Sequence, residues 1–170
     1  MLFRSHSFWV PELAGKTDVV PARKNRMWVE PTALGTFVGQ CAEFCGTQHA
    51  KMLLRVVVQT PEAFAAWAEA QKAKAVADPA VAAGRAVFES NSCVNCHTLD
   101  GTGAKGAFGP DLTHLMSRTT IASGAAPNDR ESLRAWIVDP STIKQGALMP
   151  AMKLDDDQID RLTDYLLTLR

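Results

Sequence analysis

All four cysteines of this 170-residue chain lie in two short clusters, and a histidine follows each cluster. The clusters are Cys41 and Cys45 with His49, and Cys93 and Cys96 with His97. Four cysteines permit disulfide pairing, so the disulfide alternative has to be weighed against cofactor chemistry. The tight grouping beside histidine favours metal and cofactor chemistry in both halves of the chain.

The first cluster belongs to the stretch Gly39–Met52, which reads GQCAEFCGTQHAKM. Cysteine and methionine sulfur beside imidazole suit copper, iron or zinc far better than magnesium or calcium. A closed zinc site takes four cysteine or histidine ligands and does not use methionine. A blue-copper site needs one cysteine, two histidines and a weak methionine. The second cysteine, Cys45 beside Cys41, therefore favours two copper ions that transfer electrons.

The second cluster, Ser92–His97, contains Cys-x-x-Cys-His, the attachment motif of c-type haem. Two thiols one helical turn apart reach both vinyl groups, and His97 then ligates the iron. The alternatives, a redox dithiol or half a zinc site, are disfavoured because no second cysteine pair lies nearby. A sixth ligand is expected from methionine. Met149 in the Leu148-Met149-Pro150 loop is the predicted ligand, with Met152 as the alternative.

Hydrophobic periodicity predicts short strands first and helices later. The expected strands are Met27–Val29, Leu34–Val38 and Leu53–Gln59, within a total of three to five. The expected helices are Pro61–Lys74, Pro79–Phe88, Arg130–Val138 and Asp155–Leu169, with an extended loop over Ser141–Ala151. We predict two domains, residues 1–75 and 79–170, with the boundary near Ala75–Asp78.

Composition excludes some functions. The formal net charge is zero, so nothing indicates nucleic-acid binding. No run of about 18 apolar residues is present, and Met1–Val10 is too short and polar for a signal peptide.

Trp28, Trp67 and Trp136 are expected in the core, and His114 is expected to face solvent.

The order of motifs after Cys93 resembles class I cytochromes c. The Cys-x-x-Cys-His motif is followed by Gly109-Pro110-Asp111-Leu112, the Met149 loop and an amphipathic terminal helix. The resemblance implies that the Pro110 carbonyl accepts the ring N–H of His97, and that Met149 is the axial ligand. It also implies that Gly84 and Phe88 lie where the first helix crosses the last.

The pattern Cys-x-Glu-x-Cys-x-x-x-His-x-x-Met resembles the binuclear CuA site of cytochrome c oxidase subunit II, and His6–Pro11, HSFWVP, is also similar to that family. The implied copper ligands are the bridging Cys41 and Cys45, His6, His49, the weak ligand Met52 and the backbone carbonyl of Glu43. The Glu43 carboxylate is further implied in a magnesium site shared with subunit I. Nitrous-oxide reductase carries a related CuA but usually has an aromatic residue at the Glu43 position.

A copper unit followed by a haem c domain resembles subunit II of caa-type haem–copper oxidases with a fused C-terminal cytochrome c domain. The implied fold is a partial all-β cupredoxin-like sandwich followed by an all-α class I cytochrome c domain. The implied function is electron transfer from cytochrome c through haem c and CuA to the haem of subunit I, where dioxygen is reduced to water. No catalysis is expected from this chain alone.

The resemblance also carries expectations about context. We expect oxidase subunit I, other oxidase subunits and a cytochrome c donor as partners, at the periplasmic face of the bacterial inner membrane. Relative to the family the chain is expected to be N-terminally truncated, with membrane association through a partner or through the missing N-terminal helices. The alternative function is a stand-alone haem c electron carrier with a vestigial copper segment.

Overall fold

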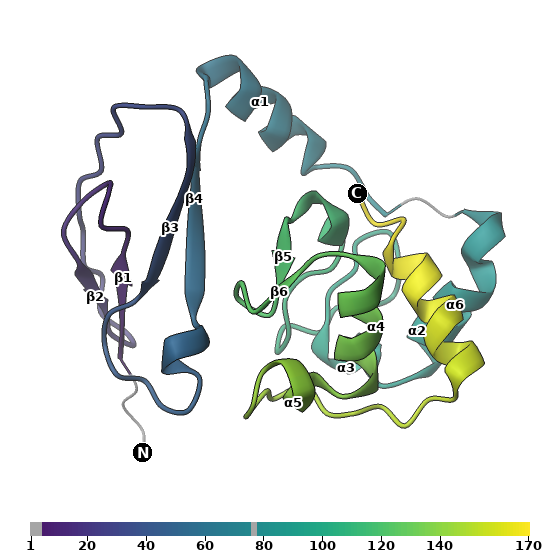
Figure 1. Cartoon of the computed structure of the whole chain (residues 1–170). Helices are drawn as coiled ribbons and strands as arrows, with labels where there is room; N and C mark the ends of the chain where they lie inside the picture. Colours follow the sequence, from purple (N-terminus) through teal and green to yellow (C-terminus); the bar gives the residue numbers. More distant parts are fainter. Residues whose placement is uncertain (1–4, 76–77) are drawn as a thin grey trace. The chain divides into compact units, whose positions relative to one another are not determined.

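The computed structural model describes residues 5–75 and 78–170, which form a β-sheet region followed by a helical region (Figure 1). Two compact units emerge: Met1–Ala70 with Ala122–Ala125, and Gln71–Ile121 with Ala126–Arg170. The domain limits expected from the sequence, 1–75 and 79–170, stay a prediction. Residues 1–4 of the first expected domain and residues 76–77 of the expected boundary lie outside the described residues.

A four-stranded antiparallel sheet with the order β2-β1-β3-β4 forms the first unit. Its strands are β1 (His6–Trp9), β2 (Thr17–Val19), β3 (Gly35–Cys41) and β4 (Leu53–Val58). The strand expected at Met27–Val29 is wrong: that segment forms no strand, and the Trp28 side chain is 93% exposed. The segment lies between Pro21 and Pro31, and proline removes a hydrogen-bond donor that a sheet needs.

Strand register brings the two copper-type motifs of the sequence together. Phe8 on β1 pairs with Cys41 on β3, so the HSFWVP segment lies directly beside the start of the cysteine loop. Gly39 allows this approach, because a Cβ there would lie only 2.7 Å from Cγ2 of Val10. A strand pair between residues distant in sequence therefore positions His6 near the cysteines.

Helix α1 (Pro61–Ala70) follows β4 and ends earlier than the predicted Lys74. The hydroxyl of Thr60 accepts a hydrogen bond from the Ala63 N–H at 3.2 Å, as expected of an N-terminal cap. Phe64 and Trp67 share one face, with ring centroids 5.6 Å apart, but both side chains are about half exposed. The core position expected for Trp67 is therefore wrong, because no buried residue lies on this helix.

The second unit is mainly helical. Its helices are α2 (Ala82–Ser90), α3 (Cys93–Cys96), α4 (Arg130–Val138), α5 (Pro140–Ile143) and α6 (Asp156–Leu166), with short 3-10 turns at Pro79–Val81 and Leu115–Ser117. A two-stranded ribbon joins β5 (Thr120–Ile121) and β6 (Ala126–Pro127). The loop expected at Ser141–Ala151 begins in α5, because Asp139 caps that turn through the Ser141 N–H at 2.9 Å. None of the helices in the described ranges has the length and hydropathy of a membrane span.

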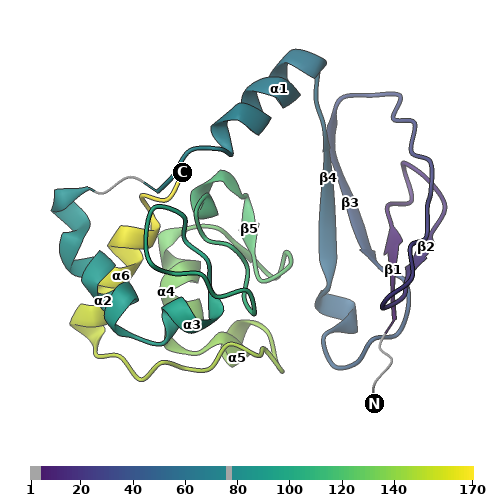
Figure 2. The ribbon, with the colours of Figure 1, turned by 180° about the vertical axis from the view of Figure 1, so that it is seen from behind.

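Packing between α2 and α6 makes the core of this unit, and Figures 1 and 2 both show the two helices side by side. A capping box between Asp155 and Gln158 starts α6. The amphipathic character expected of the terminal helix is confirmed, since the apolar residues on one side of it are all buried: Ile159, Leu162, Leu166 and Leu169. Phe88 of α2 lies against Tyr165 of α6, with ring centroids 6.2 Å apart.

The crossing depends on Gly84, as the sequence predicted. A Cβ at Gly84 would overlap the Arg161 carbonyl oxygen and lie 2.8 Å from the Tyr165 Cβ. Replacing it with alanine should therefore push the helices apart and lower the free energy of unfolding by about 1–3 kcal/mol. Thermal unfolding of the haem-loaded chain measures this.

Helix propensity alone predicts the opposite sign for Gly84→Ala, a gain of about 1 kcal/mol. The exposed Ala86→Gly variant on the same helix measures that propensity separately. A Gly84→Ala chain that unfolds at a higher temperature than the unmodified chain would contradict the close crossing.

Candidate functional site

Two buried thiols lie at the centre of the first site. Cys41 ends β3 and Cys45 lies in the loop that follows, and their Sγ atoms are 3.8 Å apart. Neither cysteine forms a disulfide bond, and both are less than a tenth exposed. The loop returns to the sheet through a hydrogen bond from the Cys41 N–H to the Met52 carbonyl at 3.0 Å. The sulfur pair is therefore held by backbone contacts at both ends of the loop.

One imidazole flanks each thiol. His6 opens β1, and its Nδ1 is 3.7 Å from Sγ of Cys41. His49 opens a 3-10 turn, and its Nδ1 is 3.7 Å from Sγ of Cys45. The turn is fixed by a hydrogen bond from the His49 N–H to the Gly46 carbonyl at 2.9 Å. His6, Cys41 and Cys45 together form a cluster with its ligand atoms within 4.8 Å.

Two weaker donors complete the arrangement. The Glu43 carbonyl oxygen is 3.2 Å from Sγ of Cys41, and Sδ of Met52 is 4.0 Å from Sγ of Cys45. Each thiol thus has one imidazole and one weaker donor beside it, so the structure brings all six predicted donors together. A donor set of thiolate, imidazole and thioether suits a soft transition metal, so these residues fit copper.

Sequence reasoning missed Phe44, an aromatic side chain beside this site. It contacts the His49 ring edge to face at 5.6 Å between centroids, while its own side chain is 80% exposed. The Cys-x-Glu-x-Cys spacing gave no signal for it, because Phe44 occupies an unspecified position of the pattern.

The second site starts on α3. Cys93 and Cys96 lie at its two ends, and the His97 N–H donates to the Cys93 carbonyl at 3.0 Å, so the three residues share one helical turn. Burial raises the pKa of the Cys93 thiol, and its own backbone hydrogen bond partly offsets this. Both thiols and the imidazole are partly buried, in the order that thioether attachment of haem requires.

The His97 ring is oriented by backbone on one side. Nδ1 lies 2.7 Å from the Pro110 carbonyl oxygen, which makes Nδ1 the donor and leaves Nε2 as the acceptor. Gly109 approaches the ring so closely that a Cβ there would lie 2.7 Å from Nδ1. Only glycine fits at position 109 beside the ring. Because Nδ1 is taken up by the Pro110 carbonyl, Nε2 is left available to bind iron, so these residues fit haem c.

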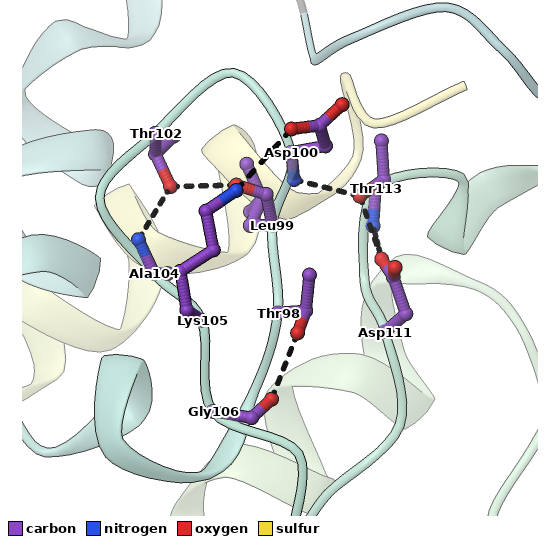
Figure 3. A network of polar contacts seen from close by, with 9 residues as sticks. All are labelled: Thr98, Leu99, Asp100, Thr102, Ala104, Lys105, Gly106, Asp111 and Thr113. Atoms are coloured by element: carbon purple, nitrogen blue, oxygen red, sulfur yellow. Dashed lines mark hydrogen bonds and ion pairs between the residues drawn. The ribbon is translucent and has the colours of Figure 1, made fainter.

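A polar network fixes the loop that carries Pro110 (Figure 3). The buried Thr113 hydroxyl donates to the Asp111 carboxylate at 2.6 Å and accepts from the Asp100 N–H at 2.8 Å. Nearby, the Thr98 hydroxyl donates to the Gly106 carbonyl at 2.9 Å. Sequence reasoning missed Thr113, because its role is visible only when the two segments lie side by side.

Met149 lies partly buried in the loop after α5, and the indole Nε1–H of Trp136 donates to its Sδ at 3.1 Å. Met152 is also partly buried. Trp136 was expected as core, but its indole is only partly buried and faces the Met149 sulfur. His114 also departs from expectation: it is partly buried, with Nε2 3.1 Å from the Gln71 carbonyl oxygen.

Two families match the chain, one in each half. The family described as cytochrome c matches residues 81–170. The family described as the periplasmic domain of cytochrome c oxidase subunit II matches residues 4–60, which indicates an extracytoplasmic location for this part. The haem-type and copper-type residues described above fall within the respective matches.

Three curated relatives align with nearly the whole of this chain. Cytochrome c oxidase subunit 2 of Alkalihalophilus pseudofirmus is 42% identical over 168 residues, covering 97% of this chain and 48% of the relative. The proteins of the same name from Bacillus sp. strain PS3 and Bacillus subtilis are 37% and 31% identical, again over 97% of this chain and 50% of theirs. The chain spans about half the length of the curated relatives it matches.

These matches explain why two metal-type sites occur in one chain. The thiol pair lies in the part that matches the oxidase subunit, and the Cys-x-x-Cys-His helix lies in the part that matches cytochrome c. The chain therefore belongs to the cytochrome c oxidase subunit II family, in the form that carries a C-terminal cytochrome c domain.

Proposed function

We propose that this chain is the electron-transfer part of a terminal respiratory oxidase. It accepts electrons from a cytochrome c and passes them through covalent haem c and a binuclear copper centre to the haem of subunit I, where dioxygen is reduced to water. When bound, haem c and the copper pair each take up and release one electron. The observation that carries the proposal is the donor arrangement around the two thiols, 3.8 Å apart.

The copper ligands are Cys41, Cys45, His6, His49, Met52 and the backbone carbonyl of Glu43. The nearly symmetric surroundings of the two sulfurs support a pair of copper ions, because each thiol has an imidazole nitrogen at 3.7 Å. Sulfurs that bridge two metals let them share one electron with little change in geometry. The surrounding sheet corresponds to part of a cupredoxin-like sandwich, within a domain of residues 1–75.

The haem ligands are His97 and Met149, with thioether links to Cys93 and Cys96. Pro110 orients His97 through its carbonyl, as the 2.7 Å contact supports. Methionine opposite histidine gives a higher potential than two histidines, which suits an electron entry site. The second domain, residues 79–170, corresponds to an all-α class I cytochrome c.

The context follows from the family. Subunit I and other oxidase subunits are the partners, cytochrome c is the donor, and the site is the periplasmic face of a bacterial inner membrane. The Glu43 carboxylate would help to hold a magnesium ion shared with subunit I. The Glu43 carboxylate and the Glu43 backbone carbonyl thus have different proposed roles, and replacing the side chain tests the first without changing the second.

Copper binding is tested in the full chain matured with haem. Cys45→Ser should lose the shared centre, because serine replaces a bridging thiolate by a hard oxygen. The unmodified chain should bind about two copper ions, measured by metal analysis beside haem quantitation. Glu43→Gln is the matched control. It should retain both copper ions, since the backbone carbonyl of residue 43 is unchanged.

A full chain that carries haem but binds no copper would contradict the copper proposal. It would favour the alternative of a stand-alone haem c carrier with a vestigial copper segment.

The axial methionine is tested by two variants. Met149→Leu should abolish the methionine-to-iron charge-transfer band of the ferric haem and lower the reduction potential, because the high-potential ligand is lost. Met152→Leu should leave the band and the potential in place. Loss of the band in Met152→Leu alone would reassign the ligand to Met152.

A further inference from the structure

We infer that the segment Gln71–Ala75, held by His114, clamps the loop that carries Pro110 and so positions His97 in the proposed haem site. We call this segment the strap. It follows α1 directly and belongs to the second compact unit. The inference rests on the proposed attachment of haem c at His97.

His114 holds the first residue of the strap. Its Nε2 lies 3.1 Å from the Gln71 carbonyl oxygen, across 43 positions of the chain. A carbonyl oxygen can only accept, so Nε2 is the donor. Both residues are partly buried, so water competes less for this hydrogen bond than it would at an exposed site. The fold therefore uses His114, although this residue belongs to no cofactor motif.

The last residue of the strap is held by backbone. The Ala75 N–H donates to the Asp100 carbonyl at 3.0 Å. Beside this contact, a Cβ added to Gly101 would lie 3.0 Å from the Ala75 carbonyl oxygen and 3.2 Å from the Lys74 Cβ. Gly101 also has a φ of +91°, a conformation that other residues rarely adopt. The strap thus lies tightly against Asp100 and Gly101.

Charge adds to the attachment at this end. Asp100 accepts a hydrogen bond from Lys105 at 3.3 Å, which is the largest cause of the lowered pKa of its carboxyl group. The positive charge of Lys74 lowers this pKa as well, so Lys74 and the Asp100 carboxylate attract each other. Solvent screens this attraction, so it is secondary to the backbone hydrogen bond.

The two attachment points are the two ends of the loop that supports His97. Asp100 and His114 flank residues 101–113, and Pro110 lies within that range. The strap contacts both flanking residues, so it closes the base of the loop. A loop closed at its base moves less, which keeps the Pro110 carbonyl at its 2.7 Å distance from Nδ1 of His97.

The Thr113 network connects the strap to Pro110 by short steps. Thr113 precedes His114, and its hydroxyl accepts from the Asp100 N–H at 2.8 Å and donates to the Asp111 carboxylate at 2.6 Å (Figure 3). Asp111 follows Pro110 directly. Both residues that the strap contacts are therefore next to this network or part of it.

The effect on the haem site has a definite sign. A hydrogen bond from Nδ1 of His97 to a carbonyl makes the imidazole a stronger electron donor to the iron. Electron donation stabilises ferric haem more than ferrous haem. If the strap is released, the Pro110 carbonyl is held less firmly and this hydrogen bond weakens. We therefore expect the haem to become easier to reduce.

The test uses the full chain loaded with haem and copper, with trypsin as the probe. Trypsin cuts after Lys72 and Lys74 in the strap, and after Lys24 in an exposed loop of the first unit. His114→Phe keeps a ring but removes the donor. Cleavage in the strap should then become about fivefold faster, the factor expected when one hydrogen bond is lost.

Two controls accompany this variant. His114→Gln keeps an N–H donor on a side chain of similar reach, so it should restore slow cleavage in the strap. Cleavage after Lys24 should have the same rate in all three chains, because that loop belongs to the other unit.

The positioning role has its own readouts. His114→Phe should raise the haem reduction potential. It should also speed the exchange of the His97 Nδ1–H with solvent, followed by nuclear magnetic resonance in the reduced protein. His114→Gln should return both toward the values of the unmodified chain. A purely structural role of His114 would change the unfolding temperature but neither of these readouts.

Two outcomes of the comparison would overturn the inference. One is equal cleavage of the strap in the unmodified chain and in His114→Phe. The other is faster cleavage with unchanged potential and unchanged Nδ1–H exchange, because the strap would then be docked without acting on His97. If His114→Phe does not fold, hydrogen exchange of the Ala75 N–H in the unmodified chain decides. Exchange at the rate of an unstructured peptide would overturn the inference.

Failure of the proposed haem ligation looks different. It would appear in the unmodified chain, whose reduced spectrum would lack the bands of a covalently attached haem ligated by histidine. No variant of His114 is needed to see it, so the two failures are distinguishable.

Discussion

Two buried sulfurs held 3.8 Å apart are the constraint on which the first site depends. Deprotonated thiols at this distance repel each other, and burial strengthens the repulsion because little water screens it. Cations between them turn the repulsion into attraction. The site is therefore built for metal, and the strand pair Phe8–Cys41 brings His6 to the same point.

Backbone groups fix candidate ligand residues in both units. The cysteine loop is closed by the Cys41 N–H and the Met52 carbonyl, and the His97 ring is oriented by the Pro110 carbonyl. The loop that carries Pro110 is held in turn by Thr113, whose hydroxyl accepts a hydrogen bond from the Asp100 N–H. Ligands held by backbone contacts move little when the charge on a metal changes, which suits electron transfer.

The clusters of candidate ligand residues were recognisable from sequence where their spacing is local. Cys-x-x-Cys-His must occupy one helical turn, and Cys41, Cys45 and His49 lie on one loop. The supporting residues were not predictable in this way. Trp136 meets Met149, and Thr113 meets Asp100, only through the folded chain.

Errors in the fold prediction have two origins. Trp28 and Trp67 were expected in the core because tryptophan is a large apolar residue, but both are exposed. Residue type alone does not tell whether another part of the chain packs against a side chain. The helix α5 was missed although Asp139-Pro140 repeats the cap-plus-proline signal of Asp78-Pro79. That signal is present in the sequence, but α5 is only four residues long, too short for hydrophobic periodicity to mark it.

In the proposed copper centre, Cys41 and Cys45 would bridge two copper ions that share one electron. Electron paramagnetic resonance of the oxidised, copper-loaded full chain tests it most directly. A shared centre should give a copper signal with hyperfine splitting from two equivalent nuclei. Splitting from a single copper nucleus would contradict it.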